Sequence, residues 1–311
     1  MKAFLLVYSI TLVGFCEIGQ ERRVTTNPAP DSEPCWSPDG NQIAFMSYHD
    51  QFPFIYIINK DGTGERPLNP TIYYPACYSP AWSPDGHLIA TATDYNSSCQ
   101  SEIICTCTIY GKNLIQLTQP SPPMMLWSDY NPTWSPDQTK VAYCTDKYDY
   151  IDQIYCVSSQ GGVSTRLTQS NGYYTNPDWS PDGTRIAFSA LDPGLDCCRI
   201  AIMPASGGVH QLITPPIFNA YNPSWSPNSQ YIAFEGKTND HSDIYIIPAW
   251  GGQIMQFTNN GYDNYNPSWS PSGLEIAYSS VRNDNEDIYI APLFAFTVRP
   301  KSLGKIKALF K

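Results

Sequence analysis

The sequence predicts an all-β protein, a six-bladed β-propeller with four antiparallel strands per blade, from three observations. Aromatic residues make up 14% of the chain, and 28 prolines and 20 glycines supply frequent turns. That composition favours many short strands over helices. A tryptophan followed by Ser-Pro and a turn recurs six times at intervals of 44 to 52 residues, the length of one blade. Finally, the last repeat lacks an outer strand that the start of the chain can supply.

The repeat itself is well defined. Its anchors are Trp36, Trp82, Trp134, Trp179, Trp225 and Trp269. Each is followed by a turn such as PDG and a strand such as TRIAFS, then a second run such as DIYIIP, a Gly-Gly turn and a third run such as HQLIT. These runs have the two-residue alternation of half-buried strands, and the segment leading into each tryptophan supplies a fourth. Four short strands per repeat therefore form one blade.

The WSPDG turn is interpreted as scaffold. Proline presets φ, aspartate bonds backbone amides, and glycine accepts a positive φ. Asn228 and Ser272 replace the aspartate in two copies, and Gln138 replaces the glycine in another. Such replacements are tolerable in a turn and awkward for a shared ligand. The tryptophans are expected to pack between adjacent blades.

The two ends of the chain are expected to close the ring. Residues 19–27 (GQERRVTTN) align without a gap with residues 252–260 (GQIMQFTNN) of the fifth repeat, so the N-terminal segment should pair into the last blade as its outer strand. The run MKAFLLVYSITLVGFC predicts a signal peptide over residues 1–16, with lipidation of Cys16 as the alternative. The propeller then spans residues 17–293, and residues 294–311 form a basic tail.

The WSPDG-x-x-IAF segment, followed by DIY and a Gly-rich turn, resembles the WD-like repeats of the bacterial TolB family. The resemblance covers residues 19 to about 293, nearly the whole of the mature chain. It implies a TolB-like six-bladed propeller. It says little about activity, because propellers support both binding and catalysis.

The loops that enter each innermost strand are the predicted binding surface. They are rich in aromatic residues and should open on one face around the central channel, beside polar, acidic loops between the second and third strands. The predicted ligand-binding residues on this channel face are Tyr74, Tyr78, Trp127, Tyr130, Tyr174, Phe218, Tyr221, Tyr265, Asp146, Asp240 and Asp284. The alternative is that tyrosines at equivalent positions only pack between the blades.

No catalytic or metal-binding set is recognised. There is no G-x-S-x-G elbow and no α/β region for a hydrolase triad. His49 and His241 fall in comparable channel-face loops, and two histidines are too few to predict a metal site. Calcium is considered at residues 283–287 or 239–243, although neither matches a full loop ligand set. Cys144 and Cys156 should lie on neighbouring strands, and most cysteines are expected to be small buried residues.

Charge and export signals limit the function. The net charge is −10, and residues 1–298 carry 13 basic against 28 acidic residues, or −15. An acidic body excludes a nucleic-acid backbone as partner, and no second segment is long enough to cross a membrane. We therefore expect an exported, periplasmic or extracellular monomer that binds a protein or peptide without catalysis or cofactor. The alternatives are a carbohydrate-binding module and a propeller enzyme, namely a metal-assisted polysaccharide lyase or a hydrolase.

Overall fold

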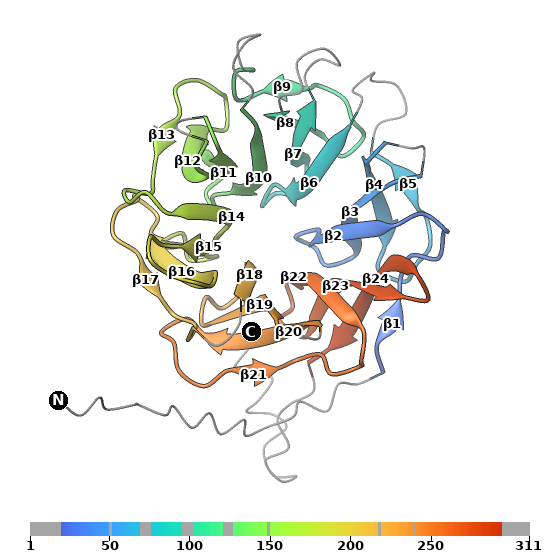
Figure 1. Cartoon of the computed structure of the whole chain (residues 1–311). Coiled ribbons are helices and arrows are strands. Elements are labelled where there is room, and N and C mark those ends of the chain that lie inside the picture. Colours follow the sequence, from blue (N-terminus) through green and yellow to red (C-terminus); the bar gives the residue numbers. More distant parts are fainter. Residues whose placement is uncertain are drawn as a thin grey trace, which may run out of the picture.

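Six four-stranded antiparallel sheets surround a central axis in a computed structural model of the chain (Figure 1). The structure describes residues 20–49, 52–68, 76–94, 102–120, 127–147, 150–216, 219–238 and 241–293. These residues contain 24 strands and no helix. The predicted all-β, six-bladed propeller is confirmed. The expected signal peptide and basic tail lie outside the described residues.

Each blade is numbered from its innermost strand outwards, and blade 1 begins with β2. The innermost strands are β2 (Asp31–Trp36), β6 (Cys77–Trp82), β10 (Asp129–Trp134), β14 (Tyr173–Trp179), β18 (Asn219–Trp225) and β22 (Asp263–Trp269). The second strands are β3 (Gln42–Ser47), β7 (Leu88–Asp94), β11 (Lys140–Thr145), β15 (Arg185–Leu191), β19 (Tyr231–Lys237) and β23 (Glu275–Arg282). The third strands are β4 (Phe54–Asn59), β8 (Glu102–Thr108), β12 (Gln153–Ser158), β16 (Arg199–Pro204), β20 (Ser242–Pro248) and β24 (Asn285–Pro292). The short outer strands are β5 (Arg66–Pro67), β9 (Ile115–Gln116), β13 (Thr165–Arg166), β17 (Gln211–Leu212), β21 (Met255–Gln256) and β1 (Arg22–Arg23).

The core lies between consecutive blades rather than at the axis. Each of six hydrophobic clusters combines residues of two neighbouring blades, and each contains one repeat tryptophan that packs against the blade before it. The six tryptophans are only 4 to 8% exposed. Burying one indole ring removes roughly 200 Å² from water and stabilises the fold by roughly 5 kcal/mol. The predicted packing role of the tryptophans is therefore confirmed.

The WSPDG turn is held by its own side chains. In blade 4, the Ser180 hydroxyl donates to Asp182 Oδ1 (2.7 Å), and that carboxylate also accepts the Thr184 amide (2.9 Å). Gly183 adopts φ 74°, and the residues that replace it in two other copies, Gln138 and Ser229, keep a positive φ of 61° and 57°. The turn geometry therefore persists where the sequence departs from the motif, as expected for scaffold.

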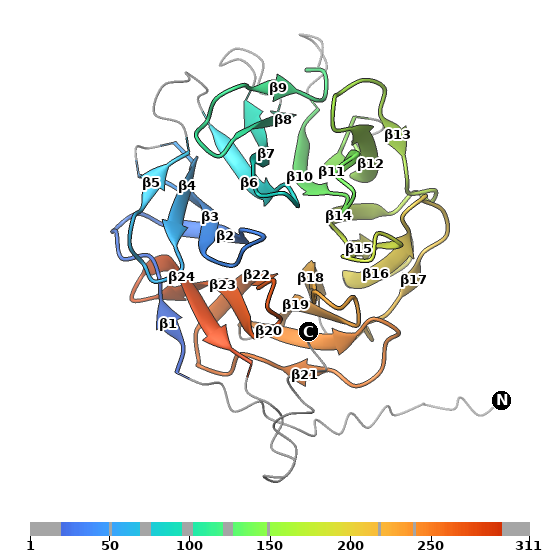
Figure 2. The ribbon, with the colours of Figure 1, turned by 180° about the vertical axis from the view of Figure 1, so that it is seen from behind.

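The N-terminal strand closes the ring beside β24 (Figure 2). Arg22 pairs with Ile290 and Arg23 with Tyr289, in the same place that Met255 and Gln256 occupy in blade 5. The carboxylate of Glu21 receives two hydrogen bonds from Arg282 (2.9 and 2.8 Å). The predicted alignment of the first strand with the outer strand of a blade is thus correct to the residue.

The described cysteines are all unpaired thiols. Cys144 lies on β11 and Cys156 on the neighbouring β12, as predicted, and both are buried. Burial raises the pKa of both thiols, which keeps them protonated and unreactive.

Candidate functional site

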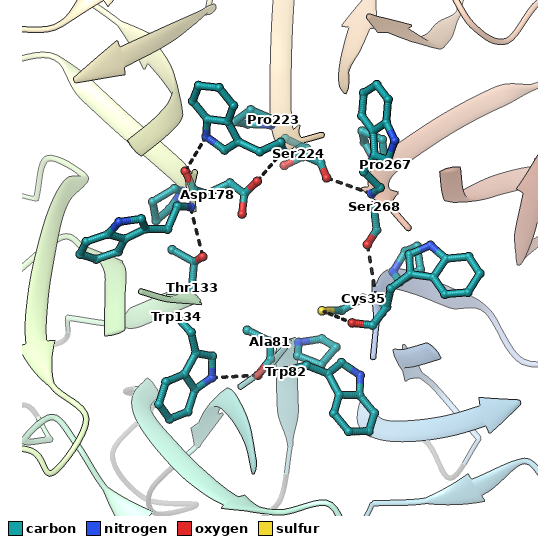
Figure 3. Close-up of a pocket in the computed structure, with 18 of the residues that line it drawn as sticks. Cys35, Ala81, Trp82, Thr133, Trp134, Asp178, Pro223, Ser224, Pro267 and Ser268 are labelled. Carbon is teal, nitrogen blue, oxygen red and sulfur yellow. Dashed lines mark hydrogen bonds between the residues drawn. The ribbon is translucent and has the colours of Figure 1, made fainter. Parts of the chain in front are cut away.

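A channel of about 500 Å³ lies between the six innermost strands (Figure 3). Every blade contributes to its wall the three residues before the repeat tryptophan, the tryptophan itself and the proline of the following turn. The wall therefore combines proline rings with polar groups at two levels, while the indoles lie behind it between the blades. These two levels, here called the bulge ring and the hydrogen-bond belt, differ in what they can offer a ligand.

The bulge ring lies three residues before each tryptophan. Its members are Glu33, Ser79, Asn131, Asn176, Asn222 and Asn266. All six adopt a left-handed φ between 49° and 54°, and the strand pairing shifts register at the same point in every blade. Asparagine is the side chain that best tolerates this conformation after glycine. The Asn of the Tyr-Asn-Pro loops is thus explained by backbone geometry, a role that the sequence interpretation missed.

The hydrogen-bond belt lies directly before the tryptophans. Its members are Cys35, Ala81, Thr133, Asp178, Ser224 and Ser268. In four blades the belt side chain accepts the tryptophan amide of the next blade: Thr133 from Trp179 (3.3 Å), Asp178 from Trp225 (2.6 Å), Ser224 from Trp269 (3.0 Å) and Ser268 from Trp36 (3.4 Å). The last of these bonds links blade 6 to blade 1. The belt therefore ties adjacent blades together around the channel (Figure 3).

Two carboxylates are the charged groups of the channel wall. Glu33 belongs to the bulge ring, and one of its oxygens accepts the amide of Ser79 (2.8 Å). Asp178 belongs to the belt, and burial raises the pKa of its carboxyl group to about 7. Burial also raises the pKa of Glu33. Neither residue was predicted from the sequence, although each departs from the residues at its repeat position, which are Asn, Ser, Thr, Cys or Ala elsewhere.

Two further acids with raised pKa values lie outside the channel wall, Glu102 of blade 2 near Glu33 and Glu235 of blade 5. Burial raises the pKa of Glu102 to about 7, with smaller contributions from the negative charges of Asp94 and Glu33. The pKa of Glu235 is likewise raised to about 7 by burial, against a hydrogen bond from Asn222 (2.9 Å). Burial is the main cause of both shifts, because it disfavours the charged form of a carboxyl group. The acids lie far apart along the chain, so their gathering at the channel face has no signal in local sequence.

The four repeat-equivalent tyrosines, Tyr78, Tyr130, Tyr221 and Tyr265, are half-buried on the innermost strands. Tyr78 and Tyr130 pack against the hydrophobic clusters between blades, and the Tyr130 hydroxyl donates to Asp152. Burial raises the pKa of Tyr78 and of Tyr265 to about 12. These tyrosines combine a packing role with partial exposure, and their role in ligand binding stays a prediction.

Other predicted residues are scattered over the channel face. The Trp127 ring receives the Lys147 ammonium 4.8 Å from its centroid, and Asp146 accepts the Ser128 amide (2.7 Å). Asp284 is exposed in the turn between β23 and β24, with φ 63°.

The remaining predicted residues are one buried tyrosine and three residues outside the described ranges. Tyr174 is completely buried, and its hydroxyl donates to Asp192 (2.5 Å); its predicted place on the surface is corrected. Tyr74, Phe218 and Asp240 lie outside the described residues.

The histidines considered as metal ligands stand apart. His49 contacts Glu65 (3.3 Å) on blade 1, and His241 contacts Asp243 (3.5 Å) on blade 5. Neither lines the channel. Among the described residues, no group of three or more His, Cys, Asp or Glu side chains is arranged to hold a metal ion. No helix within the described ranges is suited to crossing a bilayer.

Six four-stranded blades around an axial channel, closed by the first strand, define a six-bladed propeller built from WSPDG repeats. The chain belongs to the TolB beta propeller domain family, whose model matches residues 71–237. A comparison with curated proteins finds no match.

Solved structures share the fold. TolB from Acinetobacter baumannii superposes with a TM-score of 0.66 at 21% identity, covering 78% of this chain and 57% of that one. A putative TolB from Agrobacterium tumefaciens gives 0.67 at 24% identity, covering 88% and 94%. An oligogalacturonate lyase in complex with manganese gives 0.61 at 14% identity, covering 96% and 98%. At these identities the likeness is one of fold, and this chain spans little more than half of the Acinetobacter protein.

Proposed function

We propose that this chain is an exported, monomeric, non-catalytic binding protein whose channel face binds an extended segment of a protein partner. The observation that carries the proposal is the channel of about 500 Å³, whose wall combines proline rings with two polar levels. That volume accommodates a few side chains or a short peptide segment, and not a folded domain. TolB proteins among the structural relatives supply the analogy at the level of fold.

The half-buried tyrosines at the mouth support a peptide ligand. An aromatic ring that is already packed on one side loses little conformational freedom on binding, and its hydroxyl can hydrogen-bond a peptide carbonyl. Tyr221 and Tyr265 fit this description, because each is half-buried on an innermost strand. The acidic surroundings add a preference for a basic or neutral segment over an acidic one.

An enzyme is the competing proposal, by analogy with the fold of the lyase. A metal-assisted lyase needs several ligands that converge on one ion, and the described histidines contact separate carboxylates on blades 1 and 5. We therefore propose no catalytic activity and no cofactor. Incubation of the purified protein with oligogalacturonate and Mn²⁺ tests for lyase activity directly, because lyase cleavage generates an unsaturated product that absorbs in the far ultraviolet. Turnover that disappears in a His49→Ala, His241→Ala double variant would overturn the proposal.

Site-specific photo-crosslinking tests the binding role. A benzophenone amino acid placed at Ser79, on the channel wall, should capture a partner from an extract of the native organism. The same probe at Ser206, in the exposed Gly-Gly turn at the other end of blade 4, should capture none. Mass spectrometry of the Ser79 adduct should identify one contiguous stretch of the partner. Equal capture from both positions would contradict a channel-face site.

A second experiment assigns the tyrosines. Alanine at Tyr130, Tyr221 and Tyr265 together should abolish the Ser79 crosslink while the circular dichroism of the propeller is retained. Tyr110→Ala is the matched control, because that ring is 66% exposed in the turn between β8 and β9, away from the channel face. An undiminished crosslink in the triple variant would remove the tyrosines from the proposed site.

A further inference from the structure

The charges of the channel wall are arranged across the axis rather than around it. Glu33 comes from blade 1 and Asp178 from blade 4, and in a ring of six these two blades face each other (Figure 1). The charge of Asp178 reaches across far enough to add to the effect of burial on Cys35 of blade 1, raising the pKa of that thiol to about 11. The two carboxylates therefore stand on opposite walls of one narrow space.

No positive charge of the described residues balances these carboxylates inside the channel. The wall contains no lysine, arginine or histidine. One oxygen of Asp178 accepts the Trp225 amide, and the carboxylate points into the channel (Figure 3). One oxygen of Glu33 accepts the Ser79 amide. Backbone amides and the Thr133 and Ser79 side chains are the partners that hold these groups, and none of these neutral partners cancels a full charge.

The rest of the wall suits an aliphatic chain. Between the bulge ring and the hydrogen-bond belt, every blade contributes one proline, and these proline rings can cover the methylene groups of a long side chain. The indole N–H groups of Trp36 and Trp82 are buried between blades and offer nothing to a ligand in the channel. The indoles of Trp134 and Trp225 donate to backbone carbonyls of the preceding blade (3.1 Å each).

We propose that the channel binds one lysine or arginine side chain of the partner's segment, with its cationic head between Glu33 and Asp178. The inference rests on the proposed function for its source of the side chain, and its chemistry is that of an alkylammonium or alkylguanidinium group. The neutral members of the bulge ring and the hydrogen-bond belt, such as Asn222 and Ser224, can then accept hydrogen bonds from the cationic head without contributing charge. Burial raises the pKa values of Glu33 and Asp178, and a cation bound between them should lower both.

The test uses small analogues of the two side chains, so that it does not depend on the partner. n-Butylammonium and n-propylguanidinium are titrated into ¹⁵N-labelled mature protein at constant ionic strength, and the backbone amide of Trp225 reports on Asp178. We expect saturable shifts at millimolar concentration. Asp178→Asn should weaken binding by about tenfold or more, because a hydrogen bond to a charged group is lost as well as the charge. Glu33→Gln should weaken it in the same direction.

Asp61→Asn is the control, because it removes an exposed acid in the turn between β4 and β5, outside the channel, and should leave binding unchanged. The inference is overturned if n-butanol or NaCl produces the same shifts, if Ca²⁺ saturates the site while the organic cations do not, or if neither Asp178→Asn nor Glu33→Gln changes the affinity. If the cations bind as expected but the Ser79 crosslink captures nothing, the proposed function fails and the cation site stands.

Discussion

Replacing Asp178 with asparagine should stabilise the propeller at neutral and alkaline pH and leave it unchanged in acid. The Asp178 carboxyl is half-buried in the channel wall, and burial raises its pKa from 3.8 to about 7. Asparagine has nearly the same shape and keeps an oxygen to accept the Trp225 amide, which lies 2.6 Å from the carboxylate. The substitution therefore removes the charge while the hydrogen-bond belt persists.

The magnitude follows from the two pKa values. Below pH 3.8 the Asp178 carboxyl group is protonated in both folded and unfolded chains, so its ionisation does not lower the free energy of unfolding. Between pH 3.8 and about 7 the unfolded chain ionises while the folded one does not, and the folded state loses about 1.4 kcal/mol per pH unit. The loss reaches roughly 4 kcal/mol by pH 8, which corresponds to roughly 10 °C in Tm for a domain of this size.

Thermal unfolding followed by circular dichroism at pH 4, 6 and 8 measures the effect. The Tm of Asp178→Asn should match the wild type at pH 4 and exceed it by a growing margin at pH 6 and 8. Asp182→Asn, in the turn of the same blade, is the opposite control. Burial raises the pKa of Asp182, but hydrogen bonds from Thr184 and Ser180 outweigh burial and lower the pKa to about 2. The ionised Asp182 carboxylate therefore stabilises the folded state above pH 3.8. Its replacement by asparagine should reduce Tm in that pH range. Parallel pH profiles for wild type and Asp178→Asn would refute the reasoning.

Two further changes test the closure and the tryptophans. Glu21→Ala removes the bidentate partner of Arg282, so urea unfolding should show a free energy of unfolding lower by roughly 3 kcal/mol. The backbone amide hydrogen of Val24 should also exchange faster with solvent. Unchanged exchange would mean that β1 closes the ring without this ion pair. Trp134→Phe should cost about 1 kcal/mol more than Trp36→Phe, because only the Trp134 indole has an acceptor; equal losses in urea would contradict the assigned hydrogen bond.

The fold was predictable because the sequence motif of one blade is repeated six times. A single WSPDG copy indicates only a turn, whereas six copies at blade spacing predict the sheets and the inter-blade tryptophans. The alignment of residues 19–27 with residues 252–260 also predicted the closing strand to the residue. Because each position of the blade occurs in six copies, its residue type can be compared between them. A substitution in one copy therefore does not hide the pattern.

The site was predicted only in part, because it depends on where repeats differ. Tyr174 is one residue out of step with the tyrosines of other blades: Thr175 occupies their position, and Tyr174 corresponds to buried Ala220. A shift of one residue in a strand turns a side chain to the opposite face. Glu33 and Asp178 were missed for a different reason, since opposition across a channel depends on the closed ring and has no signal in local sequence.

The closing strand β1 also imposes an order on folding. Its residues are made before those of the other described strands, yet their partner on β24 is the last described strand of the chain. Until the two meet, the hydrogen-bonding edge of β24 is open, and open edges are where unrelated chains pair and aggregate. Contacts so distant in sequence also form slowly. The ring therefore cannot be completed while the chain is still being delivered, and a helper that shields the β24 edge during that interval would raise the yield of folded protein.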